Sequence, residues 1–137
     1  MSERFDMVKE YVLELGFEID EEIPEEEIVL INDHERGIHN LVIDCEESVL
    51  VLEQLIMKVD SGAGAEMYRR ILQMNRELVF GAFVLNDAAD TLLYRNTLAL
   101  DTLDLSELET TINALSLGLA ENGEELLSFA EQSAPKA

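Results

Sequence analysis

Few residues in this chain have the types and the spacing that metal binding or catalysis requires. His34 and His39 flank one predicted turn and have Asp33 and Glu35 beside them, a set of two imidazoles and two carboxylates that could hold zinc. Their spacing matches no standard zinc site, so we interpret both histidines as surface residues of a hairpin. The sequence therefore predicts no metal at this turn.

The other candidates for chemistry are a thiol and a glycine-containing loop. Cys45 precedes two glutamates, and because neighbouring anions raise the pKa of a thiol, we predict a small buried residue and no nucleophile. The segment 61–64 (SGAG) precedes a predicted helix but lacks the ending of a phosphate-binding loop, and we interpret it as a linker. With no Ser-His-Asp set, HExxH or CxxC motif, we predict a protein that is not an enzyme and holds no cofactor.

Seven acidic residues crowd the segment 18–27, and Pro24 stands among them. A calcium loop places its oxygen ligands at fixed positions around a turn glycine, and this segment has no such pattern. Phe17 and Ile19 could begin a short strand, but the segment is too charged for burial. We therefore predict a solvated linker.

The overall charge limits the classes of partner. The 137 residues carry a formal net charge of −21, from 30 acidic residues against nine Lys and Arg. Such a field repels nucleic-acid phosphates and anionic lipids, so we predict that the chain binds neither nucleic acid nor a membrane. The negative charge suits a basic partner, or it simply keeps an apolar-rich chain in solution. Hydrophobic residues make up 47% of the sequence, too many for a disordered chain.

Length and cysteine content predict one cytoplasmic domain. A chain of this size can form a core without disulfides or metals. Cys45 is the only cysteine, which suits a reducing compartment. The N-terminal residues have no apolar core of the signal-peptide type, and no apolar run reaches membrane-spanning length.

Hydrophobic spacing and turn residues predict an α+β chain of eight elements in the order α-β-β-β-α-β-β-α. The elements form one domain, 1–137, which ends in a disordered tail at 133–137. The predicted helices cover 3–15, 65–77 and about 105–129, and the predicted strands cover 28–32, 38–44, 49–59, 78–85 and 91–98.

Two predicted strands carry more apolar side chains than one core face needs. In strand 49–59 the odd-numbered residues are nearly all apolar, so we predict that they face the core, and apolar even-numbered residues imply partial cover of the other face. Strand 78–85 is apolar on both faces, which is typical of a central strand or an interface. Gly81 in this strand permits the close approach of a neighbouring element.

The last helix has the clearest pattern. Asp104 and Glu107 have capping-box spacing, with leucines at the two staple positions beside them. An apolar stripe keeps its phase beyond Asn122-Gly123. Gly costs about 1 kcal/mol relative to Ala in a helix, whereas burying a Leu contributes about 1.5–3 kcal/mol, so we predict one helix through this pair. The stripe consists of Leu105, Leu108, Ile112, Leu115, Leu119, Leu126 and Phe129.

Four segments resemble a bacterial family, the YbjN-like group, whose fold is similar to that of class I type III secretion chaperones of the Tir-chaperone type. They are 80–83 (FGAF), 93–98 (LYRNTL), 103–105 (LDL) and 110–122 (TTINALSLGLAEN). The resemblance implies a homodimer built on a twisted antiparallel sheet of about five strands flanked by helices. Secretion chaperones of this shape hold a non-globular client segment in apolar patches without ATP, and YbjN-like proteins are also labelled sensory or stress regulators.

The leading hypothesis is therefore a non-enzymatic, chaperone-like module that holds a partner or client segment as a homodimer. Its candidate contact surface combines the broad apolar face of helix 65–77 with strand 78–85. On the opposite side this helix carries the one cationic cluster of the sequence, Arg69, Arg70 and Arg76. The candidate dimer or partner residues are Met67, Tyr68, Ile71, Met74, Phe80 and Phe83.

Two alternatives stay open at this stage. One is a regulatory or sensory domain that binds a small ligand or a signalling protein in a pocket near Tyr94, Arg95 and Asn96. The other is a metal-dependent hydrolase that would use the acidic residues with His34 or His39.

Overall fold

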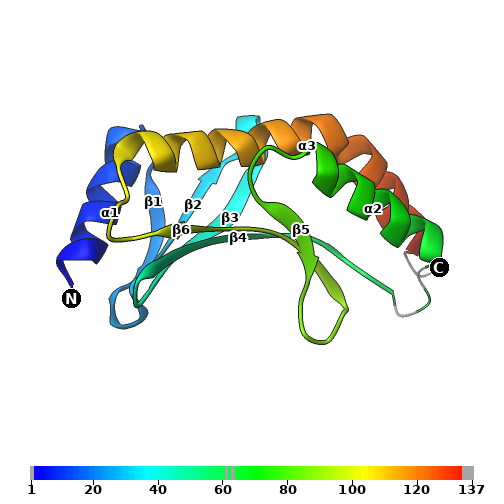
Figure 1. Ribbon diagram of the computed structural model, residues 1–137, viewed down its shortest axis with the longest axis horizontal. Coiled ribbons are helices and arrows are strands. Elements are labelled where there is room, and N and C mark those ends of the chain that lie inside the picture. Colours follow the sequence, from blue (N-terminus) through cyan, green and yellow to red (C-terminus); the bar gives the residue numbers. More distant parts are fainter. Residues whose placement is uncertain (1, 61, 63, 134–137) are drawn as a thin grey trace.

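The computed structural model describes residues 2–60, 62 and 64–133. In this part of the chain three helices lie over one face of a six-stranded antiparallel sheet with the strand order β1-β2-β3-β4-β6-β5 (Figure 1). The strands are β1 (Ile19–Ile23), β2 (Ile28–Asp33), β3 (Ile38–Glu46), β4 (Val49–Lys58), β5 (Ala82–Leu85) and β6 (Thr91–Ala99). The helices are α1 (Glu3–Glu14), α2 (Ala65–Glu77) and α3 (Leu105–Ser133), and two 3-10 turns are η1 (Pro24–Glu26) and η2 (His34–Arg36).

The predicted α+β class is confirmed, but the sheet has one strand more than predicted. The additional strand is β1, which forms in the acidic segment that was predicted to be a linker. β1 is an edge strand, so its charged side chains reach solvent while Phe17, just before it, is buried. Charge on an edge strand also hinders pairing with a further chain.

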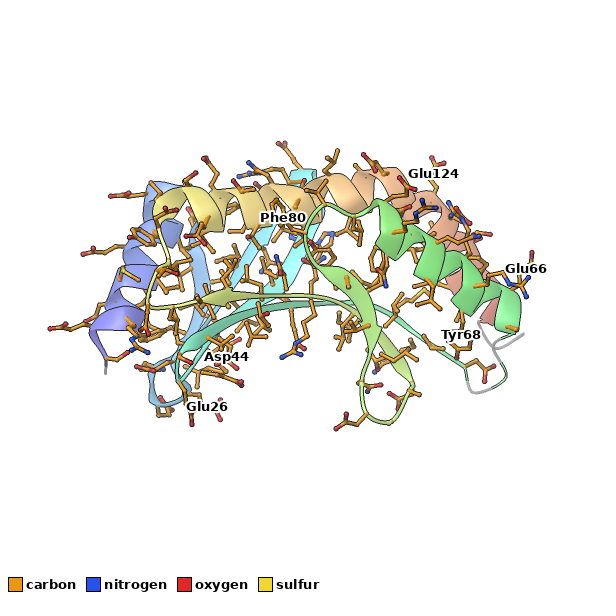
Figure 2. All side chains as sticks on the ribbon, viewed as in Figure 1. Glu26, Asp44, Glu66, Tyr68, Phe80 and Glu124 are labelled. Atoms are coloured by element: carbon orange, nitrogen blue, oxygen red, sulfur yellow. The ribbon has the colours of Figure 1, made fainter. Side chains whose placement is uncertain are left out.

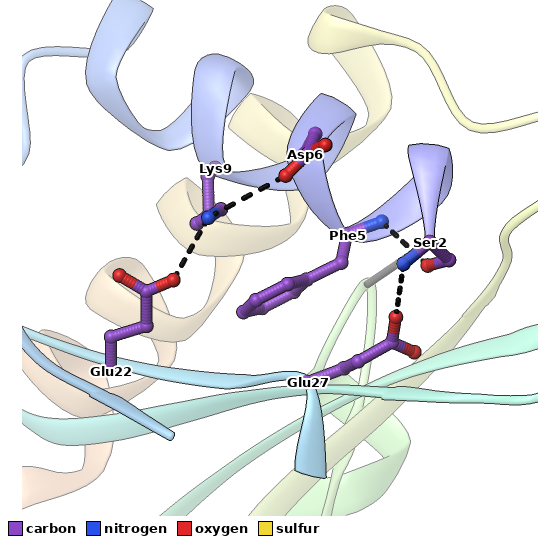
Figure 3. A network of polar contacts seen from close by, with 6 residues as sticks. All are labelled: Ser2, Phe5, Asp6, Lys9, Glu22 and Glu27. Atoms are coloured by element: carbon purple, nitrogen blue, oxygen red, sulfur yellow. Dashed lines mark hydrogen bonds and ion pairs between the residues drawn. The ribbon is translucent and has the colours of Figure 1, made fainter. Parts of the chain in front are cut away.

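Polar contacts with α1 fix this acidic segment (Figure 3). Lys9 Nζ lies 2.8 Å from the Glu22 carboxylate of β1 and 3.6 Å from Asp6. The backbone N–H of Ser2 donates to Glu27 Oε1 at 2.9 Å, and the side chain of Ser2 together with this N–H lowers the pKa of the Glu27 carboxyl. The Ser2 hydroxyl in turn accepts a hydrogen bond from the Phe5 N–H and caps α1. The linker prediction was wrong because these partners are distant in the sequence.

The prediction for the core face of β4 was also wrong. Leu50 and Leu52 are buried among the core residues, whereas the odd-numbered Leu55 is 53% exposed. A register shift between Leu55 and Met57 then reverses the alternation, so Met57 is buried after it. A bulge of this kind depends on the pairing with β6 and leaves no trace in the hydrophobic pattern of β4 itself.

The prediction of one continuous last helix is confirmed. α3 spans 29 residues and passes through Asn122-Gly123 without a break. Asp104 Oδ1 accepts a hydrogen bond from the Glu107 N–H at 2.7 Å, as the capping-box spacing predicts. Asn122 is buried and donates to the Gly118 carbonyl, which satisfies its amide within the helix. The predicted tail begins at Ser133, the last residue of α3, and 134–137 lie outside the described residues.

Strand β5 is shorter than predicted because Leu78–Gly81 forms the connection from α2. Gly81 has φ +76°, a left-handed conformation that favours glycine. The Tyr94 hydroxyl donates to the Phe80 carbonyl at 2.5 Å, and a Cβ at Gly81 would overlap this hydroxyl and its ring. The predicted close approach at Gly81 is confirmed.

The two glycines Gly81 and Gly123 give a matched test of this contact. Gly81→Ala combines a strained φ with an overlap on a buried ring, and we expect it to lower the free energy of unfolding by about 2–4 kcal/mol. Gly123→Ala adds its Cβ where no atom lies within 4 Å, and we expect a gain of about 0.5–1 kcal/mol in helix stability. Urea denaturation of both variants measures the difference, and an equal effect of the two would contradict this packing.

Candidate functional site

The structure places most of the predicted partner surface inside the chain. Met67, Ile71 and Met74 of α2 and Phe83 of β5 are each 5% exposed or less and belong to the core. Of the six predicted residues, Tyr68 is half-buried and Phe80 is 44% exposed. The broad apolar face of α2 is therefore used mainly to cover the sheet.

An exposed stripe runs along α2 beside this core face. Leu72 is 68% exposed and Val79, just beyond the helix, is 76% exposed. We call these two residues the α2 stripe; Tyr68 beside them is half-buried against the core, and Phe80 lies in a hollow with Leu98 and the start of α3. Leu72 follows Tyr68 by one helical turn, whereas Val79 comes after the end of α2 at Glu77, so helical periodicity in the sequence does not place it. The stripe is the largest apolar feature that α2 leaves in contact with solvent.

The element that carries this stripe is held firmly to the rest of the fold. Arg70 Nε lies 2.6 Å from Glu125 Oε2 and joins α2 to α3. The Asn75 side chain donates to the Phe83 carbonyl at 3.1 Å and accepts from the Phe83 N–H at 2.8 Å, so it pairs with the backbone of edge strand β5 as a neighbouring strand would. These bonds fix the α2 stripe relative to the sheet.

The pocket that was predicted near Tyr94, Arg95 and Asn96 does not form from these residues. Successive side chains of a strand point to opposite faces, so Tyr94 enters the core while Arg95 lies on the other face and pairs with Glu53 at 3.2 Å. Burial raises the pKa of Tyr94 to about 12. Asn96 accepts a hydrogen bond from the Thr97 N–H through its side-chain oxygen. The three residues therefore cannot line one cavity.

The two histidines do come together, at an open hollow of about 830 Å³ between β1, β2 and β3. His34 Nδ1 and His39 Nδ1 lie 2.7 Å apart. The neighbouring Asn32 side chain binds both Asp20 and Asn40, so the polar groups of the hollow largely satisfy one another. Within the residues described, no group of three His, Cys, Asp or Glu side chains is placed to hold a metal ion.

Cys45 is buried, as predicted, and is a poor nucleophile in this environment. Its side chain is among the core residues. Burial, with a smaller effect of the neighbouring carboxylates Glu27 and Asp44, raises the pKa of its thiol to about 12. The thiolate is therefore disfavoured at neutral pH.

The fold and its surfaces can be compared with known proteins. The family model CesT_Tir_1, of the type III chaperone family, matches residues 1–132. The chain belongs to this family. No curated protein sequence gives a significant match. None of the described helices of this CesT_Tir_1 member is long and apolar enough to cross a membrane.

Solved structures with a similar fold include YbjN and proteins of type III secretion systems. YbjN from E. coli matches with a TM-score of 0.65 and 11% identity, over 88% of this chain and 92% of that one. The Yersinia pestis type III secretion chaperone SycH, solved in complex with a fragment of YscM2, matches with a TM-score of 0.54 and 16% identity over 92% and 98%. A chain of the ExoU–SpcU complex from Pseudomonas aeruginosa matches with 0.51 and 21% over 67% and 74%. At these identities the matches show the fold, and they confirm the predicted resemblance.

Substitutions at two neighbouring residues of α2 test which of its faces is buried and which is exposed. Ile71→Asp places a charge in the core, and we expect a loss of more than about 4 kcal/mol in the free energy of unfolding. Leu72 is exposed on the single chain, so at protein concentrations too low for self-association Leu72→Asp is expected to change that free energy by about 0.5 kcal/mol or less. Thermal unfolding followed by circular dichroism measures both, and a stable Ile71→Asp protein would show that α2 does not pack as described.

Proposed function

We propose that this chain is a non-enzymatic, chaperone-like protein that binds a segment of a partner protein and acts as a homodimer in the cytoplasm. The observation that carries the proposal is the α2 stripe, a set of large apolar side chains held in solvent on a rigid support. Membership of the CesT_Tir_1 family supports it, as does the similarity to chains that were solved in complexes with other proteins.

The proposed homodimer uses the α2 stripe of both copies. Packing two copies of Leu72 and Val79 against each other would remove four side chains from water, and each buried Leu or Val contributes about 1.5–3 kcal/mol. A two-fold contact brings the same patch of both copies together. Arg69 and Arg76, both exposed on α2, would meet a chain whose surface is otherwise mainly acidic, so they reduce the repulsion between copies.

A second candidate function is a regulatory role of the YbjN type, with a small ligand or a signalling protein as the partner. The polar hollow at His34 and His39 favours it, because two imidazoles and several amide and carboxylate groups face one open space. The internal pairing of these groups makes this the weaker proposal.

The homodimer is tested by one substitution in the α2 stripe. Leu72→Asp should raise the dimer dissociation constant by about 100-fold or more, because two buried leucines are lost in each dimer. Sedimentation equilibrium of the full chain measures it, with Leu127→Asp, a change at an exposed leucine of α3, as the matched control. A wild-type chain that is monomeric at micromolar concentration, or an equal effect of both variants, would contradict the proposed dimer.

The binding role is tested by affinity capture from the native cell with mass spectrometry. The proposal predicts one dominant partner, bound through a segment that limited proteolysis cleaves in the free partner and not in the complex. The chaperone-like role fails if the chain captures no protein, or if the bound partner is a folded signalling protein without such a segment, which would favour the regulatory role.

A further inference from the structure

The face of the sheet away from the helices presents an apolar surface of its own. Leu30 of β2 and Val42 of β3 are cross-strand neighbours, and Val42 stands opposite Glu53 of β4. Their side chains are half-buried and point away from the buried residues of the same strands. Within the described residues the helices pack on the other side of the sheet (Figure 1). We call this surface the open face; its accessible apolar members are Ile28, Leu30, Val42, Leu55 and Leu93, and Val51 between them is buried.

A carboxylate without a cationic partner lies within this apolar surface. Asp44 of β3 stands opposite Ile28 of β2 and Val51 of β4. Figure 2 shows Asp44 and Glu26 close together on the side of the sheet away from the helices. Glu46 on the same strand and Glu53 on β4 also act on Asp44. Among the residues described, no Lys or Arg forms an ion pair with Asp44.

The surroundings of Asp44 make its ionised form unfavourable in the free chain. Burial, followed by a hydrogen bond with Glu46 and by the charges of Glu46, Glu26 and Glu53, raises the pKa of its carboxyl to about 6. The nearby guanidinium of Arg95 is already paired with Glu53. A cation supplied from outside would therefore gain a charge-assisted hydrogen bond with Asp44 and remove the repulsion between carboxylates.

We infer that the open face is the docking site for an extended partner segment, whose apolar side chains cover Leu30 and Val42 while a Lys or Arg pairs with Asp44. This inference rests on the proposed binding role and adds to it the location and the chemistry of the bound segment. The α2 stripe then serves self-association, and the open face serves the partner. The strongly acidic chain also attracts such a basic segment from a distance.

Charge decides between a basic partner and a second copy of this chain. A second copy would bring another Asp44, Glu46 and Glu53 to the contact, and the guanidinium of its Arg95 would already be bound. A segment with alternating apolar and basic residues instead places apolar side chains on the sheet and its cations beside the carboxylates. The chemistry of the open face therefore fits the basic segment.

The test uses the full chain and two short labelled peptides in which Val alternates with Lys or with Glu. The Lys peptide should bind and the Glu peptide should not, as measured by fluorescence anisotropy.

Pairing with a cation lowers the pKa of Asp44 below its value in the free chain, so binding releases a proton and strengthens as pH rises. Between about pH 5 and pH 7.5 the affinity should increase by about tenfold, since the free pKa is about 6.

Three variants assign the effect to the open face. Asp44→Asn should weaken binding of the Lys peptide at neutral pH and abolish the increase of affinity with pH. It should also raise the melting temperature of the chain, because it removes a disfavoured charge. Val42→Thr keeps a branched strand residue but removes apolar surface, and it should weaken binding at every pH. Asp87→Asn, at an exposed carboxylate in the β5–β6 turn, should leave both properties unchanged.

Other outcomes overturn the inference in distinguishable ways. If neither peptide binds, or if Leu72→Asp abolishes binding while Asp44→Asn does not, the open face is not the docking site, although a partner captured from the cell would still support the binding role. If Asp44→Asn or Val42→Thr changes the sedimentation of the chain alone, the face belongs to a second copy. Equal binding of the Lys and Glu peptides would exclude recognition by Asp44.

Discussion

The packing of three helices on one face of the sheet is the constraint on which the rest of the structure depends. α3 supplies the largest share of the buried helix residues, with Leu108, Ile112, Leu115 and Leu126 in the core. Each contributes about 1.5–3 kcal/mol, which exceeds the cost of about 1 kcal/mol for Gly123 within the helix. Because the described helices gather on this side, the inward residues of β2, β3 and β4 form much of the core.

The two edges of the sheet are protected by different means, which directs binding to its faces. At one edge the Asn75 side chain occupies the backbone groups of Phe83 in β5. At the other edge β1 carries Glu21 and Glu22 in a run of acidic residues, and charge on an edge strand hinders its pairing with a further strand. Exposed apolar side chains include those of the α2 stripe and of the open face. Two surfaces of this kind on one small domain suit a protein that binds both a copy of itself and a client.

Local patterns predicted the parts of the fold that depend on neighbours in the sequence. The stripe of α3 repeats at helical steps, and the cap at Asp104 follows from its spacing to Glu107, so both were predicted. β1 was missed because the contacts that hold it, such as Lys9 with Glu22, join separate elements. The faces of β4 were reversed because the bulge after Leu55 arises from pairing with β6.

The candidate site was predicted only in part, for a related reason. Periodicity shows that α2 has a broad apolar face but not which part of it another element covers. Met67 and Met74 therefore proved to be core, while Leu72 and Val79 are exposed. Asp44 gave no signal in the sequence, because an Asp near the end of a strand is common and its neighbours come from β2, β4 and η1.

The central claim, that self-association and partner binding use different surfaces, is tested most directly by carbene footprinting of the chain alone and of the chain with its captured partner. We predict that Leu72 and Val79 are protected from labelling in the chain alone, and that Val79 becomes labelled in the Leu72→Asp variant. Leu30 and Val42 should be labelled in the chain alone and protected once the partner is added. Protection of Val79 by the partner with Val42 still labelled would contradict the account.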